Sequence, residues 1–213
     1  MRLSLAGRAF HYKAGQAALL GSDERVERVP YSIASTPEET TAGGYLEFLV
    51  KLEPEGWGPH LRGLRRGSRV TVEGPFGSFV FPPRPRERQF LFVAGGTGIA
   101  PLRSMIVHAL QQGPQGKLHL LYSARTPVDF AYLAELRQHA RAGRLELALH
   151  TTREIPQRWR GERGRITQDQ LARLVEDPAT LCFVCGPAAM VDEVPRMLMR
   201  LGIAAGRIRI EEW

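Results

Sequence analysis

Apolar residues are spaced in two different patterns along this chain, and the pattern changes near residue 88. In the first half, short strand-like runs are separated by turn residues such as Gly43-Gly44 and Gly74-Pro75. The candidate strands are Arg2–Leu5, Ala17–Leu20, Tyr31–Ala34, Leu46–Leu52, Arg69–Val72 and Ser78–Phe81. Many short strands at this spacing predict a small antiparallel barrel.

The second half alternates strand-like runs with helical patterns. The runs are Phe90–Ala94, Leu118–Tyr122, Leu145–His150, Leu181–Cys185 and Arg207–Ile210, and the helical patterns lie near Leu102–Gln112, Asp129–Arg141, Gln168–Val175 and Ala189–Leu201. This alternation predicts a parallel sheet with helices on both faces. Residues 82–86, rich in Pro and Arg, are typical of a linker. We therefore expect two domains, residues 1–88 and 89–213.

A glycine-rich turn follows the first apolar run of the second half. The sequence Gly95-Gly96-Thr97-Gly98 comes directly after Leu91–Ala94, and Pro101 follows at the head of a helical pattern. Glycines let a backbone approach a ligand closely, and the free N–H groups of a helix start attract an anion. The pattern indicates a phosphate site, most simply for the pyrophosphate of a nucleotide. The alternative is that the turn serves tight packing only, and Pro101 stands where the Rossmann fingerprint has its third glycine.

Charge and composition restrict the kinds of partner and ligand that this protein is expected to bind. The 213 residues include 29 Lys and Arg against 22 Asp and Glu, a formal charge of +7. The basic residues are dispersed and form no nucleic-acid motif, so an acidic protein or a phosphate is the better candidate. No apolar run approaches membrane-spanning length and the N-terminus lacks a signal-peptide core. We expect a cytoplasmic protein without membrane insertion.

Two cysteines, Cys182 and Cys185, form a C-x-x-C pair. One such pair cannot complete a four-ligand zinc site or hold an iron–sulfur cluster. Cys182 lies inside an apolar run, which disfavours a redox dithiol, whereas Cys185 ends the predicted strand. The six histidines show no metal-ligand spacing, and no serine stands in a nucleophile elbow. Cys185 is therefore the candidate functional thiol, and no metal site is expected.

Three motifs stand in order along the chain: Pro30-Tyr31-Ser32-Ile33-Ala34-Ser35, the turn Gly95–Pro101, and Cys185-Gly186-Pro187. Together they resemble the ferredoxin–NADP reductase family, specifically its small bacterial flavodoxin and ferredoxin reductases. The resemblance implies an N-terminal antiparallel FAD-binding β-barrel. It also implies a C-terminal Rossmann-like domain, here a five-stranded parallel sheet with flanking helices, that binds NADP(H).

The resemblance also implies roles for individual residues. Tyr31 would stack on the isoalloxazine and Ser32 would hydrogen-bond near its N5, with Ile33 and Ser35 completing that site. Gly95, Gly96, Thr97 and Gly98, with Pro101, would wrap the pyrophosphate, and Cys185, Gly186 and Pro187 would lie beside the nicotinamide. Near the end of the sequence, Glu211 would assist proton or electron transfer and Trp213 would cover the flavin or the adenine. The candidate catalytic residues are thus Ser32, Cys185 and Glu211; the alternatives are that Tyr31 is a core aromatic and Trp213 a frayed end.

The choice of dinucleotide follows from the strand ends. After the second strand of the sheet no carboxylate appears until Asp129, whereas Arg125 follows at once. The third strand ends at Thr152-Arg153, and Arg165 follows. Guanidinium groups bind phosphate bidentately, so this edge favours the 2′-phosphate of NADP over NAD. The alternative is that these arginines are solvated surface residues.

The chain departs from the family pattern in two places. The family motif is Arg-x-Tyr-Ser, whose arginine grips the flavin phosphates, but Val29 stands at that position and the arginine is Arg28. A one-residue shift on a strand moves a side chain to the opposite face, so Arg28 needs a bulge to serve. The second phosphate motif is weak in residues 56–60. The barrel also begins at what looks like the family's second strand. The first strand is missing, replaced by a partner's strand, or lost to a misassigned start. A missing strand would leave an open edge, which would favour a dimer over a monomer.

These observations favour an NADPH-dependent flavoprotein oxidoreductase of FAD and NADP(H), with FMN left open. Because the chain lacks cysteines for an iron–sulfur cluster, its electron acceptor would be a separate acidic carrier such as ferredoxin or flavodoxin. One alternative is a flavin reductase that releases free reduced flavin, as Val29 suggests. Another is a non-catalytic electron-transfer or regulatory subunit of a larger complex.

Overall fold

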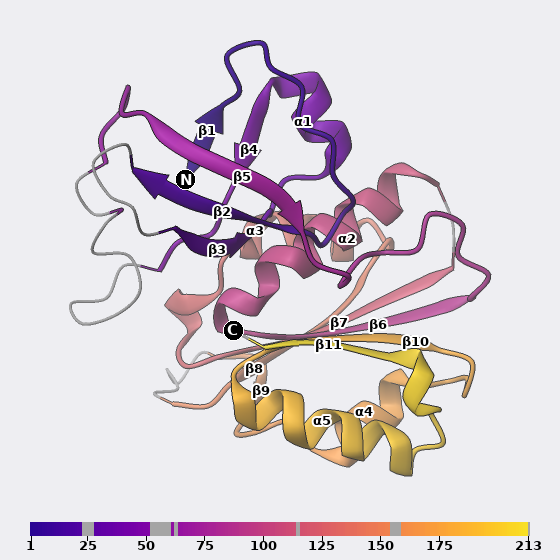
Figure 1. Ribbon diagram of the computed structural model, residues 1–213. Helices are drawn as coiled ribbons and strands as arrows, with labels where there is room; N and C mark the ends of the chain where they lie inside the picture. The colour runs from indigo at the N-terminus through magenta and orange to yellow at the C-terminus, as the bar shows by residue number, and fades with distance from the viewer. Residues whose placement is uncertain (23–27, 52–60, 62–63, 114–115, 154–158, 213) are drawn as a thin grey trace.

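A computed structural model of the protein describes residues 1–22, 28–51, 61, 64–113, 116–153 and 159–212. Short antiparallel strands make up the N-terminal part, and a parallel sheet with helices on both faces makes up the C-terminal part (Figure 1). The predicted fold class is therefore confirmed. The weak phosphate motif at 56–60 and Trp213 lie outside the described residues.

Two small sheets form the N-terminal part. One has the order β3 (Val29–Ser32), β2 (Ala17–Ser22) and β5 (Val70–Phe76), and the other pairs β1 (Arg2–Ser4) with β4 (Tyr45–Glu47). An antiparallel bridge between Ile33 and Phe48 links the two. Their inward side chains bury an apolar core that includes Leu20, Ile33, Leu46 and Phe48.

The N-terminal part contains a helix that the sequence patterns did not predict. Helix α1 (Pro37–Gly43) begins with a capping box, in which the Thr36 hydroxyl accepts from the Glu39 N–H at 3.0 Å and the Glu39 carboxylate accepts from the Thr36 N–H at 2.8 Å. The signal was present, because a Thr followed three residues later by a Glu is the capping-box signature.

The strand predicted at Ser78–Phe81 is wrong. That segment is irregular: the Phe81 N–H donates to the Ala14 carbonyl at 3.0 Å, but no strand forms, and the aromatic rings pack into the core of the C-terminal sheet. Phe79 lies edge-on to Phe183 at a centroid separation of 5.9 Å, and Phe81 lies 5.1 Å from Phe90. Alternating apolar residues produced the strand pattern, but both rings serve the other half of the molecule.

The C-terminal sheet has six parallel strands rather than the expected five. Its order is β11 (Ile208–Glu212), β10 (Leu181–Gly186), β6 (Gln89–Gly95), β7 (Lys117–Ala124), β8 (Glu146–Thr151) and β9 (Glu162–Arg163). The extra strand, β9, pairs only two residues with His150 and Thr151 of β8. A two-residue strand is too short to leave an apolar pattern.

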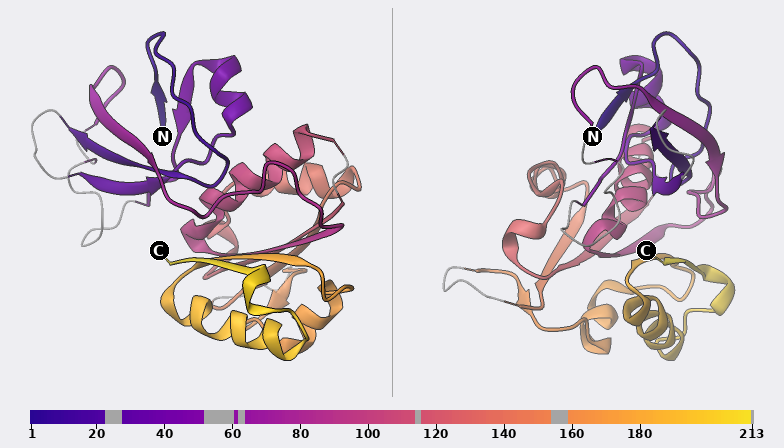
Figure 2. Two further views of the ribbon diagram at one scale, coloured as in Figure 1. Left: turned by 45° about the vertical axis from the view of Figure 1, so that its right-hand side comes forward. Right: turned by 60° about the vertical axis from the view of Figure 1, so that its left-hand side comes forward.

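Helices cover both faces of this sheet. Helices α2 (Ile99–Gln111) and α3 (Leu133–Arg141) lie between the sheet and the N-terminal strands, while α4 (Gln168–Leu174) and α5 (Ala188–Arg200) cover the far face (Figures 1 and 2). From β6 the chain adds β7, β8 and β9 on one side, and it then returns to add β10 and β11 on the other side of β6. The order in which strands are added therefore reverses between β6 and β10. Such a switch point opens a crevice at the carboxyl ends of the strands, where ligands of α/β sheets bind.

Candidate active site

The glycine turn lies at the switch point, between β6 and α2. An added Cβ at Gly95 would come within 2.8 Å of Pro187, and one at Gly98 would come within 2.3 Å of the Cys185 carbonyl oxygen. Gly96 has φ +56°, and an added Cβ there would meet nothing within 4 Å among the described residues. Gly95 and Gly98 are therefore required for close packing, whereas Gly96 leaves an open face that a ligand can approach.

The second motif lies beside the glycine turn, at the end of the neighbouring strand β10. In the sheet register Cys185 lies between Ala94 of β6 and Glu211 of β11, and Pro187 is the N-cap of α5. The Cys185 thiol is free and fully buried; burial, reinforced by the Glu211 charge, raises its pKa. It is therefore an uncharged thiol at neutral pH. Cys182 packs in the core on the opposite face of the sheet, so the two sulfurs do not form a dithiol.

Tyr31 and Ser32 lie at the end of β3, and both are buried. The Tyr31 ring packs among the apolar side chains of the N-terminal core, as the core-aromatic alternative states. Its hydroxyl, however, finds no hydrogen-bond partner in the described part of the chain, and burial raises its pKa. A buried hydroxyl without a partner is costly, so a bound group that supplied one would be favoured here.

Contacts within the protein itself account for the positions of Ser35 and Ile33. The Ser35 hydroxyl accepts from the Glu47 N–H at 3.0 Å, and the Ser35 carbonyl accepts from the Tyr12 and Ser104 hydroxyls at 2.9 and 2.7 Å. Ile33 is fully buried in the N-terminal core. A cofactor role for these two residues stays a prediction.

Arg28 is exposed just before β3, whereas Val29 is the first residue of that strand. Val29 is buried in the core, and the Arg28 guanidinium pairs with the Glu73 carboxylate of β5. The motif position that grips flavin phosphate in the family is thus occupied by an inward-facing valine. That Arg28 binds a flavin phosphate stays a prediction.

The predicted 2′-phosphate edge joins the ends of β7 and β8. The Arg153 N–H donates to the Arg125 carbonyl at 2.8 Å, so these two exposed arginines follow their strands side by side. Thr152 belongs to the same edge, because its N–H donates to the Ala124 carbonyl at 3.0 Å. Arg165 pairs instead with Glu193 of α5 at 3.4 Å.

Asp129, the first carboxylate after β7, is held within its own turn. It accepts from the Thr126 N–H at 2.9 Å and from the Thr126 hydroxyl at 2.8 Å. Both hydrogen bonds reach the same carboxylate oxygen and fix Asp129 within the turn that begins at Thr126.

Sequence reasoning missed Arg103, which the structure places between the two halves of the molecule. Its side chain is buried and donates to the Ala34 carbonyl at 2.8 Å and to the carboxylates of Glu39 and Glu135 at 2.6–2.9 Å. Burial works to lower its pKa, but the two carboxylates outweigh burial and raise it. A signal was available: Arg103 is the only charged residue between Phe90 and Val107.

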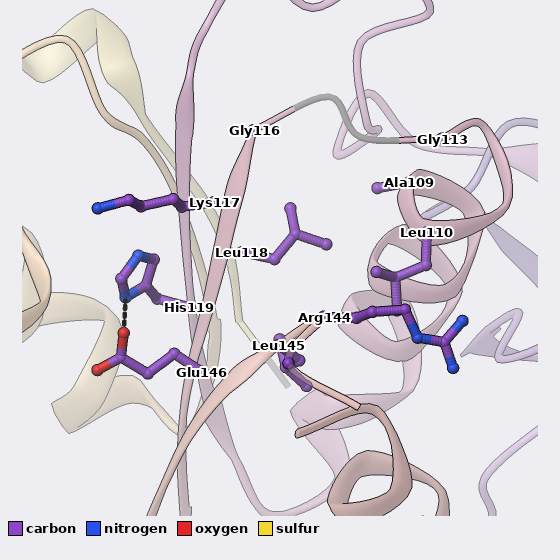
Figure 3. A pocket seen from close by; sticks show the side chains of 11 residues that line it. Ala109, Leu110, Gly113, Gly116, Lys117, Leu118, His119, Arg144, Leu145 and Glu146 are labelled. Carbon is purple, nitrogen blue, oxygen red and sulfur yellow. Dashed lines mark ion pairs between the residues drawn. The ribbon is translucent and has the colours of Figure 1, made fainter. Parts of the chain in front are cut away.

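A cavity of about 420 Å³ lies at the amino ends of β7 and β8, away from the switch point. Figure 3 shows Lys117, His119 and Glu146 on one side of the strands and Leu118, Leu145 and Leu110 on the other, with His119 and Glu146 paired at 3.1 Å. Ligands of parallel sheets bind at the opposite, carboxyl ends. The glycine turn and the Cys185 motif therefore mark the candidate active site, and this cavity does not.

Comparison with known proteins finds a family match in each half of the chain. A model of the oxidoreductase FAD-binding domain matches residues 1–81, and one of the oxidoreductase NAD-binding domain matches residues 92–196. Ferredoxin–NADP reductase B of Sorangium cellulosum is 33% identical over 221 residues, covering 97% of this chain and 87% of that protein. The chain belongs to the ferredoxin–NADP reductase family.

Other relatives show how wide this family is. A Danio rerio protein, oxidoreductase NAD-binding domain-containing protein 1, is 31% identical and covers 100% of this chain and 85% of its own length. NADH-cytochrome b5 reductase 1 of Ajellomyces capsulatus is 30% identical, over 87% of this chain and 61% of its own length. As a family member, the protein is a flavoprotein oxidoreductase with domains for FAD and a nicotinamide dinucleotide.

Solved structures show the same fold. A Neisseria gonorrhoeae ferredoxin NADP⁺ reductase with bound FAD and NADP superposes with a TM-score of 0.83 at 21% identity, covering 99% of this chain and 90% of that one. An Amycolatopsis cytochrome P450 reductase gives a TM-score of 0.84 at 26% identity, covering 97% of this chain and 62% of that one. In the residues that the structure describes, no helix combines the length and apolarity needed to cross a membrane.

Proposed function

We propose that this protein is an NADPH-dependent reductase that passes electrons through bound FAD to a separate acidic carrier protein, such as a ferredoxin or a flavodoxin. The proposal rests on one observation: a backbone hydrogen bond places Arg125 and Arg153 side by side at the carboxyl edge of the sheet, the edge that also carries the glycine turn. Two guanidinium groups there suit the 2′-phosphate that distinguishes NADPH from NADH.

The residues around the crevice fit a flavin. The unpartnered Tyr31 hydroxyl and the neighbouring Ser32 hydroxyl, both buried, offer hydrogen-bonding groups to a polar ring system. When bound, the flavin and the nicotinamide supply the hydride-transfer chemistry themselves. The chain contributes position: Gly96 leaves room for the pyrophosphate, and the uncharged Cys185 thiol presents no competing charge to the nicotinamide. Glu211, next to Cys185 in the register, stays the candidate for proton or electron transfer.

The formal charge of +7 supports an acidic partner. Opposite charge on the carrier would raise the rate of encounter and make that rate fall with salt. Sorangium cellulosum ferredoxin–NADP reductase B, the 33% identical relative, carries a name that fits such a partner.

The arginine edge gives the direct test. Arg125→Ala and Arg153→Ala should each lower kcat/KM for NADPH by about 10- to 100-fold, the effect of one lost charge-assisted contact, and leave kcat/KM for NADH within about twofold. Arg137→Ala is the control, because Arg137 is exposed on α3, away from this edge. A wild-type protein that prefers NADH, or variants that lose both activities equally, would contradict the NADPH assignment.

The Val29 position favours a second candidate, a reductase that treats flavin as a substrate and releases it reduced. Val29 is buried at the family's arginine position and the Arg28 guanidinium is paired with Glu73, so this motif offers no unpaired arginine for a flavin phosphate. Gel filtration after reconstitution with FAD separates the two proposals. A tightly binding reductase emerges yellow, whereas a flavin reductase emerges colourless and turns over NADPH only when free flavin is added.

A further inference from the structure

Helix α2 joins the two candidate cofactor sites directly. It begins at Ile99, immediately after the glycine turn, and its residues 103 and 104 bind the chain that follows β3. Arg103 donates to the Ala34 carbonyl at 2.8 Å, and the Ser104 hydroxyl donates to the Ser35 carbonyl at 2.7 Å. These carbonyls follow Ser32 by only two and three residues. One rigid helix therefore connects the dinucleotide turn to the strand end of the flavin site.

Arg103 is well suited to holding a fixed geometry. All three of its guanidinium nitrogens donate hydrogen bonds, to Glu39 of α1, Glu135 of α3 and the Ala34 carbonyl. The guanidinium also lies over the Tyr132 ring, 5.1 Å from its centroid. A planar fork with this many partners allows one arrangement, and a lysine, with a single charged nitrogen, cannot reproduce it.

Other polar contacts of α2 with the N-terminal part lie farther from the turn. His108 pairs with Glu38 at 2.9 Å, and the Thr36 hydroxyl donates to Gln111 at 3.1 Å. They hold the same two elements together, but one turn or more farther along the helix. They provide an internal comparison, because removing one weakens the interface and leaves the Ala34 contact in place.

We propose that Arg103 is a positioning residue for electron transfer from NADPH to the flavin: by fixing the strand end that carries Ser32 against α2, it sets the separation of the two cofactor sites. This inference rests on the proposed function. Transfer between bound rings depends steeply on their separation, and a misplacement of about 1 Å can slow a reaction about 100-fold. The Arg103 contact with the Ala34 carbonyl joins α2, four residues into the helix, to the chain two residues beyond Ser32.

The test compares Arg103→Met and Arg103→Lys with Glu38→Gln, which removes the carboxylate from the more distant His108–Glu38 contact. Each variant is loaded with FAD, its flavin content and unfolding midpoint are measured, and reduction of its flavin by NADPH is followed by anaerobic rapid mixing. We expect both Arg103 variants to retain FAD and to reduce it about 10- to 100-fold more slowly, with KM for NADPH changed by about twofold or less. Lysine should recover part of the loss, and Glu38→Gln should keep the wild-type rate.

Flavin reduction at the wild-type rate in Arg103→Met would overturn the proposal, as would an equal loss in Glu38→Gln, which would indicate general loosening of the interface. Where Arg103→Met does not fold, Arg103→Lys and Ser104→Ala decide by the same rate. Failure of the proposed function is seen separately, because the wild-type protein itself would then take up no FAD or show no reduction by NADPH.

Discussion

Replacing Gly98 by alanine tests whether this glycine serves packing or ligand binding. The new Cβ would lie 2.3 Å from the Cys185 carbonyl oxygen, 2.6 Å from its carbonyl carbon and 2.9 Å from the Gly186 nitrogen. All three atoms belong to the backbone of β10, so no side chain can rotate away. The turn and the strand would have to separate by roughly 1 Å, and overpacking of this kind costs about 1–3 kcal/mol.

We expect Gly98→Ala to lie at the upper end of that range. A loss of about 3 kcal/mol corresponds to a fall of roughly 6–12 °C in the unfolding midpoint of a chain of this length. Thermal unfolding followed by circular dichroism, with urea titration as a second measure, gives both quantities. The matched variant is Gly96→Ala, in which strain at φ +56° costs about 1–2 kcal/mol and the Cβ enters the open face.

The two variants should therefore differ in kind. Gly96→Ala should raise the Kd for NADPH about tenfold or more at a modest cost in stability, because its methyl group occupies the space proposed for the pyrophosphate. Gly98→Ala should lose stability first. The reasoning is refuted if Gly98→Ala unfolds at the wild-type temperature, or if Gly96→Ala binds NADPH with unchanged affinity.

Two further predictions concern buried ionisable groups. Because Cys182 and Cys185 are buried and their thiol pKa values are raised by burial, a thiol reagent at pH 8 should label neither in the folded protein and both after unfolding; rapid native labelling of either would contradict this. For Glu39, burial works to raise the pKa, but Arg103 outweighs it and holds the value below the ordinary 4.5. The Glu39–Arg103 ion pair therefore stabilises the fold above about pH 4.5, and this stabilisation is lost as the pH falls through the lower pKa of the folded state. Glu39→Gln should lower the free energy of unfolding at pH 7. It should also make that free energy decline less steeply between about pH 5 and pH 3. Urea titrations across that range check the slope, and an unchanged slope would exclude Glu39 as a source of acid sensitivity.

The sequence predicted the fold where apolar runs were long enough to set a period. Strands β6, β7, β8 and β10 were located from their strand-like apolar runs, and α2 and α5 from their apolar stripes. Helix α1 was missed because it is short and has only Thr40 buried, so its evidence lies in a cap and not in a stripe. Strand β9 was missed because two residues carry no pattern. The domain boundary at residue 88 stays a prediction.

The location of the candidate site could be predicted from the sequence, but the separate role of each residue in it could not. A glycine that packs on a neighbouring backbone and one that faces a ligand look identical in a sequence, and only coordinates separate Gly98 from Gly96. Arg103 stood out as a lone charge in an apolar run, yet its partners Glu39 and Glu135 lie 64 and 32 residues away. Long-range pairing of this kind is set by topology, which the local pattern does not contain.

The aromatic segment after β5 limits how this protein can be divided. Phe79 and Phe81 precede the linker, yet their rings fill the layer between α2 and the sheet beside Phe92 and Phe183. A dinucleotide module excised at residue 89 would lack both rings and expose the phenylalanines beneath them to water, inviting aggregation. Exchange of halves between relatives would succeed only if the junction were moved upstream of Phe79, so that each half kept the side chains that complete its own interior.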